Sequence, residues 1–213
     1  NCTKDAVRYC ERAKKAGADA VLVVTPYYNK PSDEGIYRHF EAVSKVGIPV
    51  VVYNIQGRTG RNIETSLLER IVQLPNMVAV KEASGNVSQM MDVIAKIKLK
   101  NPDFAVLSGD DSLSLPLIAA GGDGVISVVS NIAPTEVTNL VQSALNDDMS
   151  KARELHYKLL PFFKAAFVDG NPSSIKYAMS TKGMIKPCVR LPLVEVKESA
   201  KSVIENALKE CNL

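Results

Sequence analysis

Residues 77–82, Met77-Val78-Ala79-Val80-Lys81-Glu82, form an apolar, valine-rich run that ends in a lysine and a glutamate. A similar run, Pro49-Val50-Val51-Val52-Tyr53-Asn54, brings a tyrosine to its end 28 residues earlier (81 minus 53). Runs of this composition are typical of strands buried in a parallel sheet. The spacing predicts neighbouring strands of a strand-helix-strand repeat, with Lys81 and Tyr53 at their carboxyl ends.

Lys81 is a candidate Schiff-base lysine. An ammonium group at the end of an apolar strand is costly to desolvate, so we expect a lowered pKa and a neutral amine that can attack a carbonyl. Tyr53 would then supply a phenol that transfers protons in a partly dry site. A lysine at a strand end is more often a solvated edge charge, so these two residues alone leave both interpretations open.

The same kind of run recurs along the first 129 residues. The five predicted strands are Asp19–Thr25, Pro49–Tyr53, Met77–Lys81, Phe104–Ser108 and Gly124–Val129. Apolar residues at helical spacing lie between strands: Ile36, Phe40 and Val43 in one interval, and Met90, Val93, Ile94 and Ile97 behind Asn86 as N-cap in another. Alternation of strands and helices predicts a parallel α/β fold, and continuous apolar strands predict burial on both faces of the sheet.

After Val129 the strand pattern stops and a helical tail is predicted. Its helices are Pro134–Leu145, Lys151–Phe167, Ser173–Thr181 and Val194–Leu213, separated by proline-containing segments.

Composition narrows the class of protein. The 213 residues are 46% hydrophobic and 23% charged, which favours one main globular domain, and a net charge of +3 gives no basis for a nucleic-acid or membrane partner. Four cysteines without CxxC spacing and two histidines argue against zinc and disulfide frameworks, so no metal is expected.

No apolar run approaches the roughly 20 residues of a membrane span and no signal peptide opens the chain. We therefore expect a cytoplasmic protein.

Five groups of polar and glycine residues follow the predicted strands, where β/α barrels carry their chemistry. They are Thr25–Asn29, Tyr53–Gly60, Lys81–Gly85, Ser108–Asp111 and Gly121–Ser127. In this order they resemble the dihydrodipicolinate synthase family of pyruvate-dependent class I aldolases, over essentially the whole chain. The resemblance implies a TIM (β/α)8 barrel, with strands 4–8 in residues 1–146 and a C-terminal helical segment in residues 147–213. It also implies a homodimer or homotetramer formed through the Tyr27-Tyr28 region.

The barrel of this family needs eight strands in about 250 residues, and the sequence predicts five. We therefore expect that the N-terminal part of the barrel, with a Gly-Thr-Thr-Gly-Glu motif that holds the pyruvate carboxylate, lies upstream of Asn1.

The resemblance implies a reaction. Lys81 matches the lysine that forms an imine with pyruvate, without any cofactor, and the derived enamine attacks L-aspartate 4-semialdehyde. Ring closure gives 4-hydroxy-tetrahydrodipicolinate, a precursor of diaminopimelate and lysine. Tyr53 matches the proton-relay tyrosine, and Tyr28 matches the tyrosine that crosses the dimer interface to complete the relay of the neighbouring subunit.

The resemblance also implies binding residues. Arg58 matches the arginine that holds the semialdehyde carboxylate, as suits a planar guanidinium. Gly109 and Ile126 match positions whose backbone lines the substrate pocket. Gln56 stands where the family usually has proline, which should loosen the loop of Arg58.

A possible allosteric site for lysine follows from the same comparison. Asn1, Asp5 and Tyr27 fall where lysine-inhibited members bind the effector. Asp5 is one methylene shorter than the usual glutamate.

Two alternatives stay open at the level of sequence. One is an aldolase or lyase of the same superfamily acting on a sugar acid, such as N-acetylneuraminate or a 2-keto-3-deoxy acid, although Arg58 favours the synthase. The other is an inactive barrel fragment that serves as an interaction module.

Overall fold

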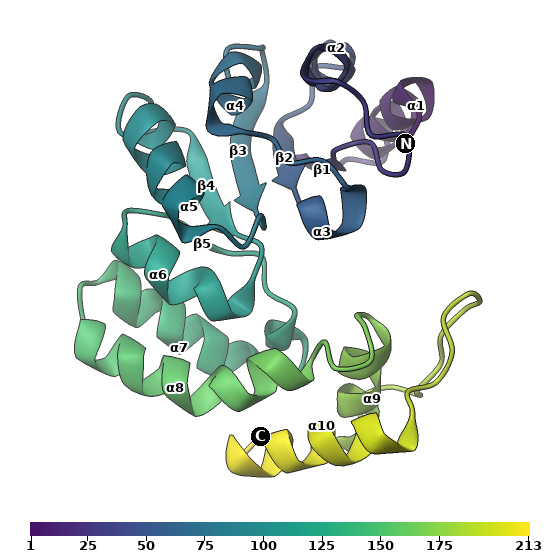
Figure 1. The fold of residues 1–213 in the computed structure, drawn as a ribbon, viewed down its shortest axis with the longest axis vertical. Coiled ribbons are helices and arrows are strands. Elements are labelled where there is room, and N and C mark those ends of the chain that lie inside the picture. The colour runs from purple at the N-terminus through teal and green to yellow at the C-terminus, as the bar shows by residue number, and fades with distance from the viewer. The chain divides into compact units, whose positions relative to one another are not determined.

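A computed structural model describes residues 1–213, which fall into two compact units. The first unit comprises Asn1–Gly109 and Ala120–Val125, and the second comprises Asp110–Ala119 and Ile126–Leu213. Helices and strands alternate in the first, whereas the second is helical (Figure 1).

The first unit is an α/β structure. Its strands are β1 (Val21–Val24), β2 (Val50–Asn54), β3 (Met77–Glu82), β4 (Ala105–Ser108) and β5 (Gly124–Val125). Its helices are α1 (Thr3–Lys15), α2 (Asp33–Ser44), α3 (Gln56–Thr59), α4 (Thr65–Ile71) and α5 (Val87–Val93), and α5 continues into a π-helical turn, η1 (Ile94–Lys98).

The strands form one parallel sheet in sequential order, β1 to β5, as the sequence predicted. Its register aligns the strand ends, because Val24 is paired with Tyr53, Tyr53 with Lys81, and Lys81 with Leu107. Side chains at paired positions point to the same face of the sheet. The sheet therefore places Tyr53 and Lys81 side by side.

The fifth strand is shorter than predicted, since it ends at Val125 and not at Val129. The residues that follow turn toward a short helix, η3 (Val129–Asn131). The buried Asp111 carboxylate accepts hydrogen bonds from the backbone N–H of Val128 at 2.9 Å and of Val129 at 3.3 Å. These donors are therefore not used in a strand ladder.

The predicted burial of both faces of the sheet is confirmed for only part of it. On the face that packs against the helices, Val23, Val52, Val80 and Val106 are all buried. On the opposite face Leu22 keeps 46% of its surface exposed. The sheet is open, with β1 and β5 at its edges, and helices α1, α2, α4 and α5 lie along one side of it (Figure 1). The second face is therefore uncovered at the edge strand β1, whereas Ala79 on β3 is only 4% exposed.

Two predicted helices of this unit are confirmed. Ser32 caps α2 by accepting a hydrogen bond from the N–H of Gly35, and Asn86 caps α5 in the same way for Gln89. The predicted apolar rows Ile36, Phe40 and Val43, and Met90, Val93, Ile94 and Ile97, are buried. Helices α1, α3 and α4 were not predicted; α1 has apolar residues at helical spacing, Ala6, Cys10 and Ala13, of which only Cys10 is buried.

The second unit holds the predicted helical tail. Its elements are η2 (Asp111–Leu113), α6 (Ser114–Ala119), η3, α7 (Pro134–Leu145), α8 (Met149–Ala165), α9 (Ser173–Thr181) and α10 (Glu198–Glu210). Helices α7 and α8 lie side by side, and α10 packs on α8 and α9 (Figure 1). The largest fully buried side chains of this unit are Leu117, Leu140, Leu159, Phe162 and Ile204. Helix α10 starts later than predicted, at Glu198, and α6 was not predicted.

None of these helices combines the length and the apolar character that crossing a membrane requires.

Candidate active site

Lys81 and Tyr53 are neighbours across β3 and β2. The Nζ atom of Lys81 lies 4.3 Å from the centroid of the Tyr53 ring. Lys81 is only 9% exposed, which is unusual for a lysine. The two groups thus sit within reach of one small carbonyl substrate, in a site with limited access to water.

The phenol of Tyr53 is in its protonated form at neutral pH. Burial raises the pKa of Tyr53, and the positive charge of Arg58 acts in the opposite direction. The opposing effect shows that the guanidinium lies within electrostatic reach of the phenol. Tyr53 is therefore placed to donate a proton and to take it back.

A cleft of about 450 Å³ opens at the carboxyl end of β1 and β2. Tyr53, Arg58 and Tyr27 line it, together with apolar side chains that include Leu22 and Val24. Arg58 projects from the four-residue helix α3, which ends at Gly60 in the left-handed conformation (φ 75°). The cleft combines one cation and two phenols with an apolar wall, which suits a small anionic substrate.

Gly109 packs directly on the lysine. A Cβ atom at Gly109 would lie 2.6 Å from Cβ of Ala83 and 3.1 Å from Cε of Lys81. Its backbone N–H donates to the carbonyl of Glu82 at 2.7 Å. The absence of a side chain at this position therefore makes the space in which the lysine chain lies.

The structure does not bring all predicted residues together. Tyr28 is 87% exposed, has a left-handed backbone (φ 70°) and does not line the cleft. Ile126 belongs to the second unit, at the start of the loop that Asp111 holds.

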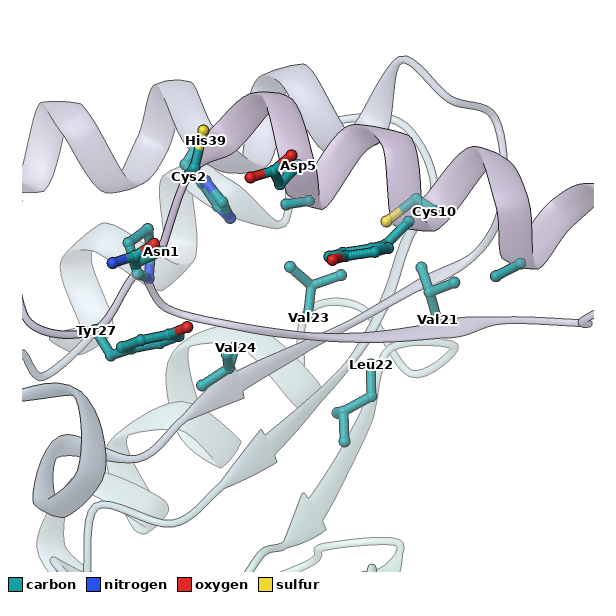
Figure 2. A pocket seen from close by; sticks show the side chains of 14 residues that line it. Asn1, Cys2, Asp5, Cys10, Val21, Leu22, Val23, Val24, Tyr27 and His39 are labelled. Carbon is teal, nitrogen blue, oxygen red and sulfur yellow. The ribbon is translucent and has the colours of Figure 1, made fainter. Parts of the chain in front are cut away.

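Asn1, Asp5 and Tyr27 line one cavity of about 410 Å³, between α1 and β1. Figure 2 shows Asp5 on α1 above the strand, with Asn1 and Tyr27 at one end of the cavity and His39 behind. The Asp5 carboxylate pairs with Arg8 at 3.0 Å, and Asn29 donates to the Asn1 carbonyl at 3.2 Å. The Nδ1 atom of His39 lies 3.0 Å from Oγ1 of Thr3, while its buried Nε2 has no hydrogen-bond partner.

A buried polar cluster that was not predicted from the sequence lies behind Lys81 and Tyr53. Asn54 and Glu82, each the next residue along its strand, are fully buried and paired in register. Their side chains are hydrogen-bonded to each other, and Gln89 joins them. The signal was present in the sequence, since adjacent strand residues point to opposite faces and both strands carry polar residues at two successive positions.

No group of three or more histidine, cysteine, aspartate or glutamate side chains is arranged to hold a metal ion.

Comparison with known proteins agrees with this geometry. The model of the dihydrodipicolinate synthetase family matches residues 1–211. The chain belongs to this family. Its α/β fold, with a parallel sheet of five strands, matches solved structures of this family, which belongs to the TIM-barrel class.

Curated members of the dihydrodipicolinate synthetase family cover nearly the whole chain. The 4-hydroxy-tetrahydrodipicolinate synthase of Protochlamydia amoebophila is 48% identical over 209 residues, which are 98% of this chain and 70% of the relative. That of Methanocaldococcus jannaschii is 45% identical over 215 residues, 100% of this chain and 73% of the relative.

Solved structures of the family superpose closely. The dihydrodipicolinate synthase of Thermotoga maritima has a TM-score of 0.97 at 42% identity, covering 100% of this chain and 72% of that chain. A structure described as the first monomeric dihydrodipicolinate synthase variant gives the same TM-score and identity, with 100% and 71% covered. Family members therefore include at least one monomeric form.

Proposed function

We propose that this chain catalyses the condensation of pyruvate with L-aspartate 4-semialdehyde to 4-hydroxy-tetrahydrodipicolinate, a step of lysine and diaminopimelate biosynthesis. The observation that carries the proposal is the contact between Nζ of Lys81 and the ring of Tyr53, 4.3 Å apart at paired strand positions. The reaction is that of the relatives at 48% and 45% identity, both of which are named 4-hydroxy-tetrahydrodipicolinate synthase.

The mechanism starts from the amine of Lys81. After it loses its proton, the amine attacks the pyruvate carbonyl, and loss of water leaves an imine. Removal of a methyl proton gives an enamine whose carbon attacks the aldehyde of the semialdehyde. The amino group of that substrate then displaces Lys81, closing the ring and freeing the lysine. The covalent imine takes the place of a cofactor.

Tyr53 would move the protons that these steps require. Its phenol, like that of an ordinary tyrosine, is protonated at neutral pH, and burial raises its pKa further. It can donate to the oxygen that leaves as water and accept a proton later, and a well-placed group of this kind is worth roughly two to four orders of magnitude in rate.

Arg58 would bind the carboxylate of the semialdehyde. It lines the same cleft as Tyr53, and its guanidinium acts on the Tyr53 phenol electrostatically. A planar guanidinium can donate two parallel hydrogen bonds to a carboxylate. The second substrate would therefore be held beside the imine with its aldehyde toward Lys81.

We assign Tyr28 to a subunit interface. A tyrosine that is 87% exposed next to another that is 49% exposed supports a surface covered by a second copy. In that dimer or tetramer Tyr28 would complete the relay of the neighbouring subunit. Gly109 and Ile126 would line the substrate pocket through their backbone.

The cavity between α1 and β1 would bind lysine as a feedback inhibitor. Asn1, Asp5 and Tyr27 line it together, which supports a common ligand with an amino group and a carboxylate. Asp5 offers the anion for the amino group of that ligand.

We also assign the five strands to strands 4–8 of a (β/α)8 barrel, within residues 1–146, and residues 147–213 to the C-terminal helical segment. Their sequential parallel order supports this assignment.

Two assays separate this function from the sugar-acid alternative. The protein should form the ring product from pyruvate and aspartate semialdehyde, and should release little pyruvate from N-acetylneuraminate or 2-keto-3-deoxy acids. Faster pyruvate release from a sugar acid than ring formation would overturn the proposal. Absence of both activities would support the non-catalytic module.

A further inference from the structure

A buried carboxylate lies directly behind the amine and the phenol of the proposed site. Glu82 follows Lys81 on β3 and is fully buried. Because successive strand residues point to opposite faces, its carboxylate lies on the helix-covered side of the sheet. A buried charge is stable only when it is well hydrogen-bonded. The hydrogen-bond partners of Glu82 therefore indicate which parts of the structure it holds in place.

The partners of Glu82 are three amide groups. Oε1 accepts a hydrogen bond from the backbone N–H of Ser84 at 2.6 Å. Oε2 accepts from Nδ2 of Asn54 at 3.0 Å and from Nε2 of Gln89 at 3.4 Å. A carboxylate can accept from both sides at once, whereas a neutral amide in its place would turn a donor toward donors.

The same two side-chain amides hold the segment after Arg58. The side chain of Asn54 accepts from the N–H of Ile63 at 3.0 Å and donates to Oδ1 of Asn62 at 2.9 Å. Gln89 donates to the Ile63 carbonyl at 3.0 Å and accepts from Nδ2 of Asn62 at 2.7 Å. Both ends of the loop between Asn54 and Asn62 are therefore tied to one cluster.

The alignment of Lys81 with Tyr53 does not depend on this cluster alone. Backbone hydrogen bonds of the parallel sheet fix their register, and the N–H of Ala83 donates to the Asn54 carbonyl at 2.8 Å. The C-terminal end of the Arg58 loop, at Asn62 and Ile63, is by contrast held to the sheet by the side chains of Asn54 and Gln89. These two side-chain amides are oriented by donating to the Glu82 carboxylate.

From this geometry we infer that Glu82 is a positioning residue, which holds the Arg58 loop through Asn54 and Gln89 and so sets the use of the second, carboxylate-bearing substrate. The inference rests on the proposed function. Glu82 and Lys81 are expected to affect different steps. Loss of the Glu82 hydrogen bonds leaves the Lys81 amine and the Tyr53 phenol in place and displaces the Arg58 guanidinium.

The first test is Glu82→Gln, which keeps the size of the side chain and removes one acceptor. The KM for aspartate semialdehyde should rise about tenfold, the effect of one poorly satisfied buried hydrogen bond. Borohydride trapping of the pyruvate imine should stay within about twofold of the unsubstituted protein. A rise in KM below twofold, or a parallel loss of imine formation, would overturn the inference.

Two further variants keep the test decisive if Glu82→Gln folds poorly. Gln89→Met removes the donor to Ile63 and Glu82 at similar volume, and should raise the semialdehyde KM in the same direction. Ser44→Ala removes a buried hydroxyl that donates to the Glu41 carbonyl at 2.9 Å, and should leave the semialdehyde KM and the trapping of the pyruvate imine unchanged. If unsubstituted protein formed no imine, the proposed function would fail, independently of Glu82.

Discussion

The alkyl chain of Lys81 is held in a narrow space at the carboxyl end of the sheet. Gly109, the residue after β4, packs against it, and the ring of Tyr53 contacts its ammonium group from β2. A lysine loses much side-chain entropy when it is fixed in one place. The residues around Lys81 pre-organise the amine for attack on a carbonyl before any substrate arrives.

Gly109→Ala should therefore impair imine formation. The new Cβ would lie 2.6 Å from Cβ of Ala83 and 3.1 Å from Cε of Lys81, so the lysine chain has to move. Single-turnover trapping with pyruvate and borohydride should show a fall of tenfold or more, the scale expected when a reacting group is displaced by about 1 Å. The control is Gly57→Ala, where no atom lies within 4 Å of a new Cβ. Equal trapping by both variants would show that Gly109 does not constrain Lys81.

Arg58→Ala should affect the second substrate and spare the first. Loss of a desolvated charge pair costs about 2 to 5 kcal/mol, so kcat/KM for aspartate semialdehyde should fall steeply while the pyruvate imine still forms. Arg61→Ala is the matched control, since Arg61 lies three positions away and pairs with Asp33 at the surface. If imine trapping fell as much as turnover, Arg58 would have a structural role.

The sequence predicted only those residues of the candidate site whose side-chain type is itself reactive or charged. Lys81, Tyr53 and Arg58 follow strand patterns and have reactive or charged side chains. Polar residues at two successive strand positions mark Asn54 and Glu82 as candidates. Their hydrogen bonds to Gln89 and to Ile63 could not be predicted, because only the fold brings these separate segments together.

At the scale of elements, strand and helix type followed from periodicity, whereas boundaries depended on tertiary contacts. The strand at Gly124 ends early because Asp111 takes the N–H groups of Val128 and Val129. The apolar row after Asn86 predicted a helix, and the structure adds a π-helical turn from Ile94 that periodicity alone does not reveal.

Asp111→Ala should destabilise the second unit. The change would leave the Ser127 hydroxyl and two backbone N–H groups without their buried acceptor. Unsatisfied buried donors cost about 1 to 3 kcal/mol each, so we expect a loss of about 3 kcal/mol in urea unfolding. Asp148→Ala, at the exposed N-cap of α8, should cost only about 1 kcal/mol. Similar losses for the two variants would contradict the role given to Asp111.

Helix α2 carries a histidine that should make the fold sensitive to acid. Burial lowers the pKa of His39 from 6.5 to about 4, so the folded protein holds the neutral ring. This contribution to stability is present above pH 6.5 and is lost as pH falls toward 4. The interval of about 2.5 units corresponds to at most about 3 kcal/mol.

Chemical unfolding at pH 7 and pH 4.5 measures this effect. His39→Gln removes the titrating group and should lose less stability between the two pH values than the unsubstituted protein. An equal loss in both proteins would show that His39 does not carry the acid sensitivity.

At the scale of the whole molecule, the sheet of the first unit has two unpaired edges and one partly uncovered face. Open parallel edges and exposed apolar surface favour association. The 213-residue chain should therefore elute in size-exclusion chromatography as associated species whose share grows with concentration. Leu22→Lys, on the exposed face of β1, should reduce association, whereas Leu99→Lys, an exposed position at the end of η1, should not. A monodisperse monomer at high concentration would contradict this expectation.

The central claim is that Lys81 forms an imine with pyruvate. Treatment with pyruvate and borohydride, followed by peptide mapping, should place a stable adduct on Lys81, and Lys81→Ala should abolish it. Lys30 and Lys176 are exposed or partly exposed amines that would react if the trapping were unspecific. An adduct on either of them, or no adduct in folded protein, would contradict the mechanism.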